Sequence, residues 1–239
     1  ELIQIGKEQS LLPASHLNIA LGPLVQTWRI GFSDARIPNN DEVAHALSLT
    51  DPQLIELDPL SCTVFLAKEG MKLDLGCLAK GYVADKIADY LKSQHVMSAL
   101  INLGGNIKTI GANVLANRPW QIGIQNPRQP RGTNLAVLPI SNQSVVTSGT
   151  YERKLQVNEH TYHHILDRKT GYPVDTQLAS ITIISDNSLD GEIWTTRLYG
   201  EKPKQLLARV EQEKGIEVLM VTTDNRVYYS SGISPEFLA

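Results

Sequence analysis

The chain has 239 residues, of which 42% are hydrophobic and 20% are charged, so it is long enough for one large core or two small ones. Its net charge of -3, without any run of lysine or arginine, argues against a nucleic-acid-binding groove. No apolar run approaches the roughly 20 residues that a membrane-spanning helix needs.

The first forty residues carry few signals. The chain begins at Glu1 without an initiator methionine or a signal peptide, which indicates a trimmed or a mature fragment and leaves the targeting open. Residues 1–14 show little periodicity. Residues 23–28 predict a short helix or turn, and residues 41–49 predict a helix capped by Asn40, with acidic side chains in its first turn that suit the helix dipole.

The next segment predicts strands followed by a helix. Residues 55–57 and 63–68 predict strands, and the turn after them leads into a further strand at 72–75. Apolar residues recur at helical spacing from Leu78 to Ser93. Residues 76–81 therefore lie where a strand ends and a helix begins, and the unpaired backbone N–H groups there suit a phosphate.

The rest of the chain alternates irregularly between strands and helices. A buried strand at 98–103 ends at Gly104 and Gly105, and a helix lies within 198–213, interrupted or started at 200–203. This irregular order favours an α+β fold over a doubly wound sheet, and we expect one domain over residues 1–239. Further strands are predicted at 135–140, 145–146, 155–157, 181–184, 218–222 and 227–229.

Four polar segments interrupt these elements, at 73–85, 102–106, 147–153 and 163–173. The last one places two histidines, an aspartate, two cations, a hydroxyl and a Gly-Tyr-Pro turn within eleven positions. Such segments position functional groups more often than they fill a core. We interpret the four segments as the walls of a single ligand site.

Taken singly, several features have ordinary explanations. Residues 76–81 match neither a Walker loop nor a dinucleotide-binding fingerprint, and a strand–glycine–helix connection is common. Gly104 and Gly105 would more often form a plain turn than a close approach to a ligand. His163 and His164 are either surface imidazoles, or include one satisfied, partly buried histidine, or act in the site.

Two further features stay open. Asp190, with the hydroxyls of Thr195 and Thr196 further along the same segment, has oxygen ligands that suit Mg²⁺, but a capped helix start is the simpler interpretation of this segment alone. The three tryptophans are either core or ring-stacking residues. Cys62 and Cys77 are too few for a disulfide framework and lack a metal-binding spacing, so two free thiols are favoured over one bridge.

Together and in this order, the segments resemble the ApbE family of FAD:protein FMN transferases. Single motifs are modestly specific, whereas the ordered set from residue 22 to residue 200 is strongly so. The motifs are Gly-Pro-Leu-Val…Trp at 22–28, Asp-x-Gly-x-x-Ala-Lys-Gly-Tyr ending in Asp at 74–85, Asn-x-Gly-Gly at 102–105, Thr-Ser-Gly-x-Tyr at 147–151, His-Ile-x-Asp-x-x-Thr-Gly-Tyr-Pro at 164–173, and a late Asp…Thr pair.

The resemblance implies an ApbE-like α+β fold related to the T-fold, with mixed or antiparallel sheets flanked by helices. It also implies an enzyme that uses Mg²⁺ to cleave the pyrophosphate of FAD. Such an enzyme attaches FMN through a phosphoester to a threonine or serine of a partner flavoprotein and releases AMP. Family membership further implies an extracytoplasmic location, with the full-length protein anchored to the membrane as a lipoprotein.

The family's site residues carry over motif by motif. His164, which would handle the acceptor hydroxyl proton or the phosphate, and Asp190 are the predicted catalytic residues. The resemblance implies Mg²⁺ ligands at the backbone carbonyl of Ala79, at Asp190 and at Thr195. The implied FAD contacts are Trp28, Ile30, Gly76, Tyr82, Asp85, Asn102, Gly104, Gly105, Ser148, Gly149, His164 and Ile165.

Three departures from the family pattern bear on these assignments. The family's metal-binding threonine lies four residues after the aspartate, where this chain has Trp194, so Thr195 is the nearest hydroxyl. Cys77 replaces a glycine or other small residue, and the family's N-terminal segment is absent before Glu1, which predicts weaker FAD binding. The alternatives are a hydrolase that splits FAD into FMN and AMP, and a non-catalytic flavin-binding module, which the Trp194 departure favours.

Overall fold

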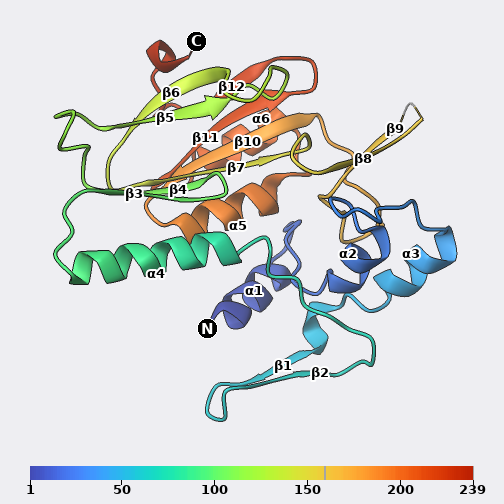
Figure 1. Cartoon of the computed structure of the whole chain (residues 1–239). Helices are drawn as coiled ribbons and strands as arrows, with labels where there is room; N and C mark the ends of the chain where they lie inside the picture. Colours follow the sequence, from blue (N-terminus) through green and yellow to red (C-terminus); the bar gives the residue numbers. More distant parts are fainter. Residues whose placement is uncertain (159, 239) are drawn as a thin grey trace. The chain divides into compact units, whose positions relative to one another are not determined.

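The computed structural model describes residues 1–158 and 160–238. The chain divides into two compact units (Figure 1). Unit 1 comprises residues 1–77, 150–175 and 196–200, and unit 2 comprises residues 78–149, 176–195 and 201–239. All strand pairs of the described residues are antiparallel, which confirms the α+β class. The expectation of one domain over residues 1–239 stays a prediction.

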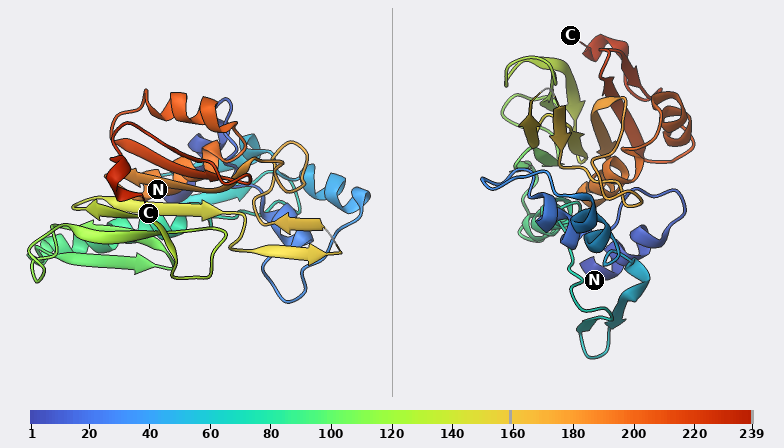
Figure 2. Two further views of the ribbon diagram at one scale, coloured as in Figure 1. Left: turned by 90° about the horizontal axis from the view of Figure 1, so that it is seen from above. Right: turned by 90° about the vertical axis from the view of Figure 1, so that its right-hand side faces the viewer.

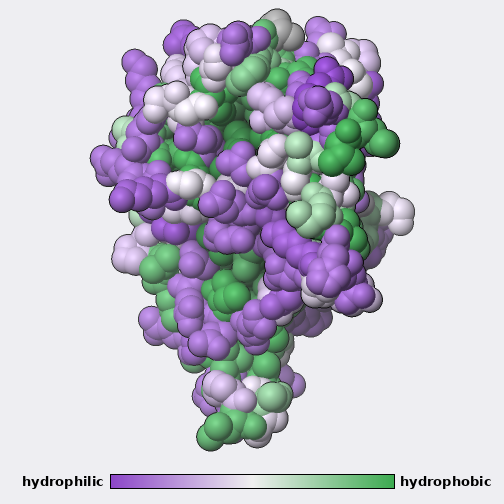
Figure 3. Space-filling view, turned by 90° about the vertical axis from the view of Figure 1, so that its left-hand side faces the viewer, coloured by the Kyte–Doolittle hydropathy of each residue, from purple (hydrophilic) through white to green (hydrophobic). Residues whose placement is uncertain are grey.

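Unit 1 is built from short helices and two separate hairpins. Its core combines residues of α2, α3 and the turn after β9: Leu24, Trp28, Ile30, Val43, Ala46 and Leu166. The outer end of the β1–β2 hairpin carries exposed apolar side chains (Figure 3). The elements are α1 (Leu2–Leu11), α2 (Gly22–Trp28), α3 (Asn40–Leu47), the 3₁₀ turn η1 (Pro52–Leu54), β1 (Ile55–Asp58), β2 (Thr63–Leu66), β8 (Lys154–Val157) and β9 (His160–His163).

Unit 2 is a six-stranded sheet in the order β12-β11-β10-β7-β4-β3, with a hairpin of β5 and β6 on one face and α4 on the other (Figures 1 and 2). Its strands are β3 (Ala99–Leu103), β4 (Asn106–Ile110), β5 (Trp120–Gln125), β6 (Asn134–Ile140), β7 (Ser144–Gly149), β10 (Leu178–Ser185), β11 (Ile216–Thr222) and β12 (Val227–Tyr229). Its helices are α4 (Ala79–Ser93), α6 (Pro203–Val210), the 3₁₀ turn η2 (Pro235–Phe237) and most of α5 (Ser188–Leu198).

The alternation of side chains along β4 decides which of them face the helices. Ile107 packs into the core beneath the β5–β6 hairpin, whereas Ile110 packs against α4. Because successive side chains of a strand point to opposite faces, Asn106 and Lys108 lie on the same face as Ile110. The sheet therefore presents two polar side chains to the face that α4 covers.

Most predicted elements are confirmed with small shifts at their ends, including α2, α4, β1, β2, β6, β8, β10, β11 and β12. The N-cap of α3 is Asn39 rather than Asn40, because Asn39 and Glu42 form a reciprocal capping box. The helix predicted within 198–213 is α6, and its start at Pro203 confirms the predicted break at 200–203, since α5 ends at Leu198.

Other predictions were wrong or incomplete. Residues 72–75 do not form a strand, because β2 pairs with β1 and the backbone N–H of Asp74 donates to the Ile19 carbonyl instead. Helix α1 was missed because it buries Gly6 and Ser10 rather than an apolar stripe. Strand β3 is only partly buried, since it lies at the edge of the sheet. Strands β4, β5 and β9 were also missed.

Two expectations about covalent and membrane chemistry can be compared with the structure. Cys62 and Cys77 are both free thiols, as predicted. Among the described residues, no helix combines the length and the apolar character needed to cross a membrane.

Candidate functional site

The predicted site residues fall into two sets, one in each unit. In unit 1, the two adjacent histidines have different roles. His163 is buried, its Nδ1 accepts from the Ile165 backbone N–H at 3.3 Å, and its Nε2 lies 2.9 Å from the Val174 carbonyl oxygen. Since Nδ1 accepts, the proton is on Nε2, which donates to Val174. Burial lowers the pKa of His163, so it is a neutral structural residue.

His164 is the partly exposed member of the pair. Its backbone N–H donates to the Arg153 carbonyl at 3.2 Å, and its Nδ1 lies 3.3 Å from the same oxygen. A carbonyl oxygen only accepts, so Nδ1 carries the proton in this contact and Nε2 is the nitrogen that can take up another. This arrangement suits the predicted role of His164 as a base.

The turn after His164 is shaped by local backbone contacts. One oxygen of Asp167 accepts from the backbone N–H groups of Lys169 at 2.6 Å and Thr170 at 2.9 Å. Gly171 has φ +76°, and a Cβ there would lie 2.8 Å from the Val43 side chain. The aspartate and the glycine of this motif therefore build the turn and seat it on α3.

Trp28 holds the same turn from the other side. Its indole Nε1 donates to the Gly171 carbonyl at 2.8 Å, and its ring lies 5.6 Å from the rings of both Tyr162 and Tyr172. The side chain is completely buried, which favours the core interpretation over ring stacking on a ligand. Neighbouring Ile30 is also buried, so FAD contacts by these two residues stay predictions.

Arg168 anchors the turn to the N-terminal segment. Its Nη1 donates to the carbonyl oxygens of Ser10 at 2.6 Å, Ser15 at 3.2 Å and Leu17 at 3.2 Å. Burial lowers the pKa of the guanidinium. These three contacts give Arg168 a structural role in the turn.

The remaining predicted FAD contacts of unit 1 lie in backbone turns. Ile165 is partly buried, and its backbone N–H donates to His163 Nδ1. Gly76 is exposed, and its N–H donates to Asp74 Oδ1 at 2.8 Å, an Asx turn just before α4. The structure gives both residues a local conformational role.

In unit 2, the start of α4 is open to an anion. Its N-cap residue is Leu78, whose side chain accepts no hydrogen bond, and its first turn contains no acidic residue. The first backbone N–H groups of a helix have no partner within the helix, and the dipole favours negative charge there. The helix start predicted at residues 76–81 is confirmed, and its chemistry suits a phosphate.

The first turns of α4 and α5 are in backbone contact. A Cβ on Gly81 would lie 2.5 Å from the Ser188 carbonyl oxygen and 2.8 Å from the Leu189 Cα. Only glycine permits this approach. Ala79 is the first residue of α4 and Asp190 lies in the first turn of α5, so the contact brings the two helix starts that carry these predicted ligands together.

Two of the three predicted Mg²⁺ ligands suit the ion, and the third does not. A backbone carbonyl at Ala79 and a carboxylate at Asp190 are the oxygen ligands that Mg²⁺ takes. Asp190 is partly exposed and accepts from Asn187 Nδ2 at 3.1 Å. Thr195 is completely buried and its hydroxyl donates to the Glu192 carbonyl at 3.1 Å, so in this conformation it does not fit. The Trp194 ring faces Arg209 of α6.

Glu192, which was not among the predicted site residues, lies between Asp190 and Thr195 in α5. Its carboxylate is buried, and Oε1 accepts from Lys80 Nζ at 2.7 Å and from Asn106 Nδ2 at 2.8 Å. The sequence did contain a signal for it. The spacing of four residues between acid and threonine, which Asp190 lacks, is met by Glu192 and Thr196. Among the described residues, no group of three or more acidic, histidine or cysteine side chains could hold a metal.

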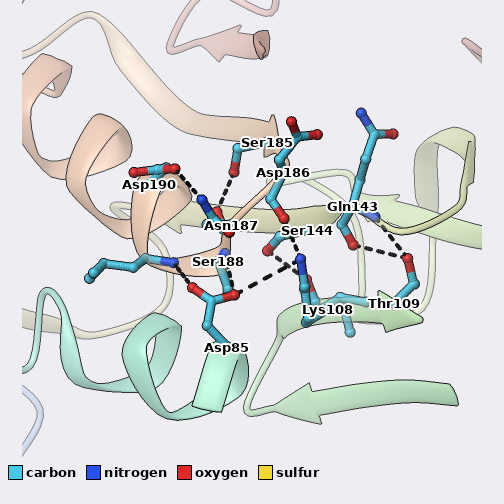
Figure 4. A network of polar contacts seen from close by, with 12 residues as sticks. Asp85, Lys108, Thr109, Gln143, Ser144, Ser185, Asp186, Asn187, Ser188 and Asp190 are labelled. Carbon is cyan, nitrogen blue, oxygen red and sulfur yellow. Dashed lines mark hydrogen bonds and ion pairs between the residues drawn. The ribbon is translucent and has the colours of Figure 1, made fainter. Parts of the chain in front are cut away.

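Asp85, a predicted FAD contact, forms hydrogen bonds with other residues of unit 2. Its two carboxylate oxygens accept from the backbone N–H groups of Ser188 and Leu189, each at 2.8 Å (Figure 4). Lys108 lies on the other side of this carboxylate, 4.0 Å from Oδ1. Tyr82 is partly buried, with Lys86 Nζ 5.0 Å from its ring centre.

The glycine pair after β3 forms the turn of a hairpin. Gly104 and Gly105 have φ +62° and +94° and connect the paired residues Leu103 and Asn106, while Asn102 Oδ1 accepts from the Gly105 N–H at 2.9 Å. A two-residue hairpin turn of this type needs positive φ at both positions. A Cβ at either glycine would meet nothing within 4 Å, so the turn is also open to a ligand.

The last predicted FAD contacts of unit 2 lie at the end of β7. Ser148 pairs with Ile181 and Gly149 pairs with Ser180 of β10. Both residues are therefore held by the central strands of the sheet, and their contact with FAD stays a prediction.

Comparison with known proteins gives consistent results. The sequence profile of the ApbE family matches residues 1–220. The chain is 45% identical over 231 residues to the FAD:protein FMN transferase of Klebsiella pneumoniae (strain 342), covering 97% of this chain and 71% of that protein. It is 36% identical over 228 residues to the FAD:protein FMN transferase of Treponema pallidum (strain Nichols), covering 90% of this chain and 63% of that protein.

Solved structures agree with these relatives. The crystal structure of the ApbE protein from Thermotoga maritima has a TM-score of 0.87 at 27% identity and covers 100% of this chain and 77% of that one. The apo flavinyl transferase ApbE from Pseudomonas stutzeri has a TM-score of 0.80 at 27% identity, covering 100% of this chain and 74% of that one.

Proposed function

Because the chain belongs to the ApbE family, we propose that it is a flavin transferase, which cleaves FAD and transfers FMN to a partner flavoprotein. The observation that carries the proposal is the match over residues 1–220 by a family whose motifs this chain holds in order. The similarity to two relatives named FAD:protein FMN transferase supports it. The chain spans 71% and 63% of those two relatives.

The chemistry proposed for unit 2 is the binding of the diphosphate of FAD. The uncapped start of α4 supplies backbone N–H donors for phosphate oxygens. The Ala79 carbonyl and Asp190 would hold Mg²⁺, which neutralises charge on the non-bridging oxygens when it is bound. Lys80 lies next to the same helix start, where Glu192 holds its ammonium at 2.7 Å.

The chemistry proposed for unit 1 is proton transfer at the nucleophile. A threonine or serine hydroxyl of the acceptor must lose its proton as it attacks phosphorus. His164 Nε2 would accept that proton, while the Arg153 carbonyl holds Nδ1–H and so orients the ring. The bond formed is a phosphoester to FMN, the bond broken is the P–O–P link of FAD, and AMP leaves.

A direct test uses the protein with FAD, MgCl₂ and an acceptor flavoprotein that carries the target threonine. We expect an FMN-sized mass increment on the acceptor, AMP release in equal amount, and loss of both with EDTA. AMP release without a labelled acceptor would instead indicate an FAD pyrophosphatase. Stoichiometric FAD binding without AMP would indicate a flavin-binding module, the alternative that the buried Thr195 hydroxyl favours.

The proposal includes a location outside the cytoplasm, with the full-length protein anchored to the membrane. It is based on family membership alone. Fractionation of cells that produce the full-length protein tests it: recovery with the membranes, exposed to protease added from outside the cytoplasmic membrane, is the expected result.

A further inference from the structure

We propose that Asp85 and Lys108 are positioning residues for flavin transfer, because together they hold the turn from which Asp190 projects (Figure 4). This inference rests on the proposed function. It assigns to Asp85 a role in orienting α5 in place of a direct contact with FAD.

The carboxylate of Asp85 caps the start of α5 from another helix. The N–H groups of Ser188 and Leu189 open the helix and have no acceptor within it. Both donate to the carboxylate of Asp85, which belongs to α4 and is 103 residues away from Ser188 in the chain. A carboxylate at a helix start is also favoured by the dipole, so this contact fixes both the position and the direction of α5.

Lys108 holds the residue just before the helix. Its side chain is 5% exposed, and its ammonium donates to the Asp186 carbonyl oxygen and lies 4.0 Å from Asp85 Oδ1. An ammonium is buried at a cost unless it is paired, and here the two contacts provide the pairing. Lys108 thus binds the backbone carbonyl of residue 186, while Asp85 binds the backbone N–H groups of residues 188 and 189.

The segment between these two charges directs Asp190. The Ser185 hydroxyl donates to the Asn187 carbonyl at 2.7 Å, and the Asn187 side-chain amide donates to Asp190 Oδ2 at 3.1 Å. The Ser188 hydroxyl donates to Asn106 Oδ1 at 2.5 Å. A shift of the turn would therefore move the Asp190 carboxylate, although neither Asp85 nor Lys108 touches it.

The test compares Asp85→Asn and Lys108→Met with matched controls at exposed positions before β11, Glu213→Gln and Lys214→Met. Steady-state kinetics of the full chain with FAD, Mg²⁺ and the acceptor should show kcat about 10–100-fold lower in the first two variants. The KM for FAD should change by less than about threefold, because no substrate contact is removed. The double variant should lose no more than the more impaired single variant, since the pair acts as a unit.

Amide hydrogen exchange supplies a readout that does not depend on activity. The backbone amides of residues 186–191 should exchange faster in both variants and at an unchanged rate in the controls. The amides of β10 and β11 should keep their protection in every variant. Lys108→Gln replaces Lys108→Met if the latter does not fold. Unchanged kcat per folded molecule, or unchanged exchange at 186–191, overturns the proposal. If the native protein transfers no flavin, the proposed function fails, and the exchange data still decide whether the pair holds the turn.

Discussion

The turn at residues 163–173 and the start of α5 each present one predicted catalytic side chain, but different kinds of contact hold them. In the turn, Asp167 bonds to backbone groups two and three residues later, and Gly171 supplies the positive φ. At α5, the capping carboxylate of Asp85 lies more than 100 residues from its partners. Local bonds shape the backbone of the first region, which Trp28 and Arg168 then anchor from a distance. The start of the second region is capped by a carboxylate from a distant helix.

The largest effect should separate the two histidines of the turn. We expect His164→Ala to lower the rate of FMN transfer by about 10²–10⁴-fold, the range for loss of a general base, without unfolding the chain. His163→Ala should instead lower the free energy of unfolding by about 1–3 kcal/mol, since Val174 loses its buried donor. Transfer rates and denaturant unfolding of both variants measure this; full activity of His164→Ala would refute its role.

The stability of the contact between α4 and α5 should be sensitive to one methyl group added at Gly81. Gly81→Ala places a Cβ against the Ser188 backbone, and we expect a loss of about 2–3 kcal/mol in unfolding free energy together with slower transfer. Gly104→Ala is the control, because no atom lies near its Cβ and only the positive φ costs about 1 kcal/mol. Equal losses in the two variants would contradict close helix packing at Gly81.

The anchoring of the turn to the N-terminal segment should have a smaller effect. Arg168→Met removes the donor for three carbonyl oxygens, and we expect about 1–2 kcal/mol lower unfolding free energy. Lys169→Met, next to it and exposed, should change stability by less than about 0.5 kcal/mol. Thermal unfolding of the two variants measures the difference. A larger loss of stability in Lys169→Met than in Arg168→Met would show that Arg168 does not anchor the turn.

The smallest effect is a pH dependence of stability that comes from His163. Burial lowers its pKa in the folded state below the unfolded value of about 6.5. Its contribution to stability is therefore complete above about pH 6.5 and is lost as the pH falls through the folded pKa, by at most about 1.4 kcal/mol per pH unit. His163→Gln should flatten the curve of unfolding free energy between pH 7 and pH 5, and an unchanged slope would show that the pKa of His163 is the same in the folded and unfolded states.

Much of the fold was predictable where its contacts are short in sequence. The helical spacing from Leu78 to Ser93 predicted α4, and the N-cap of α3 was predicted at Asn40, one residue from its place at Asn39. The prediction of helices and strands failed where the buried residues of a segment are not its apolar ones, or where an apolar segment has no strand to pair with. Helix α1 buries a glycine and a serine, and residues 72–75 look like a strand but pair with no strand.

The candidate site was predictable as a set of segments but not as a set of roles. The family motif selected His164 as the functional histidine, whereas local residue chemistry alone does not separate it from His163. The carbonyl that pairs with His163 belongs to Val174, beyond the turn, and its position depends on tertiary packing. Likewise, Thr195 was chosen by spacing, and only the packing of α5 shows that its hydroxyl is buried.

By itself, then, the amino-acid sequence determined the turns, the caps and the identity of the polar segments, because these depend on bonds between residues a few positions apart. The tertiary structure alone decided which polar groups are buried and satisfied: Asp85 at the start of α5, Lys108 on Asp186, and Glu192 on Lys80. Those partners meet only after β4, α4 and α5 have packed on one another, so no local pattern encodes them.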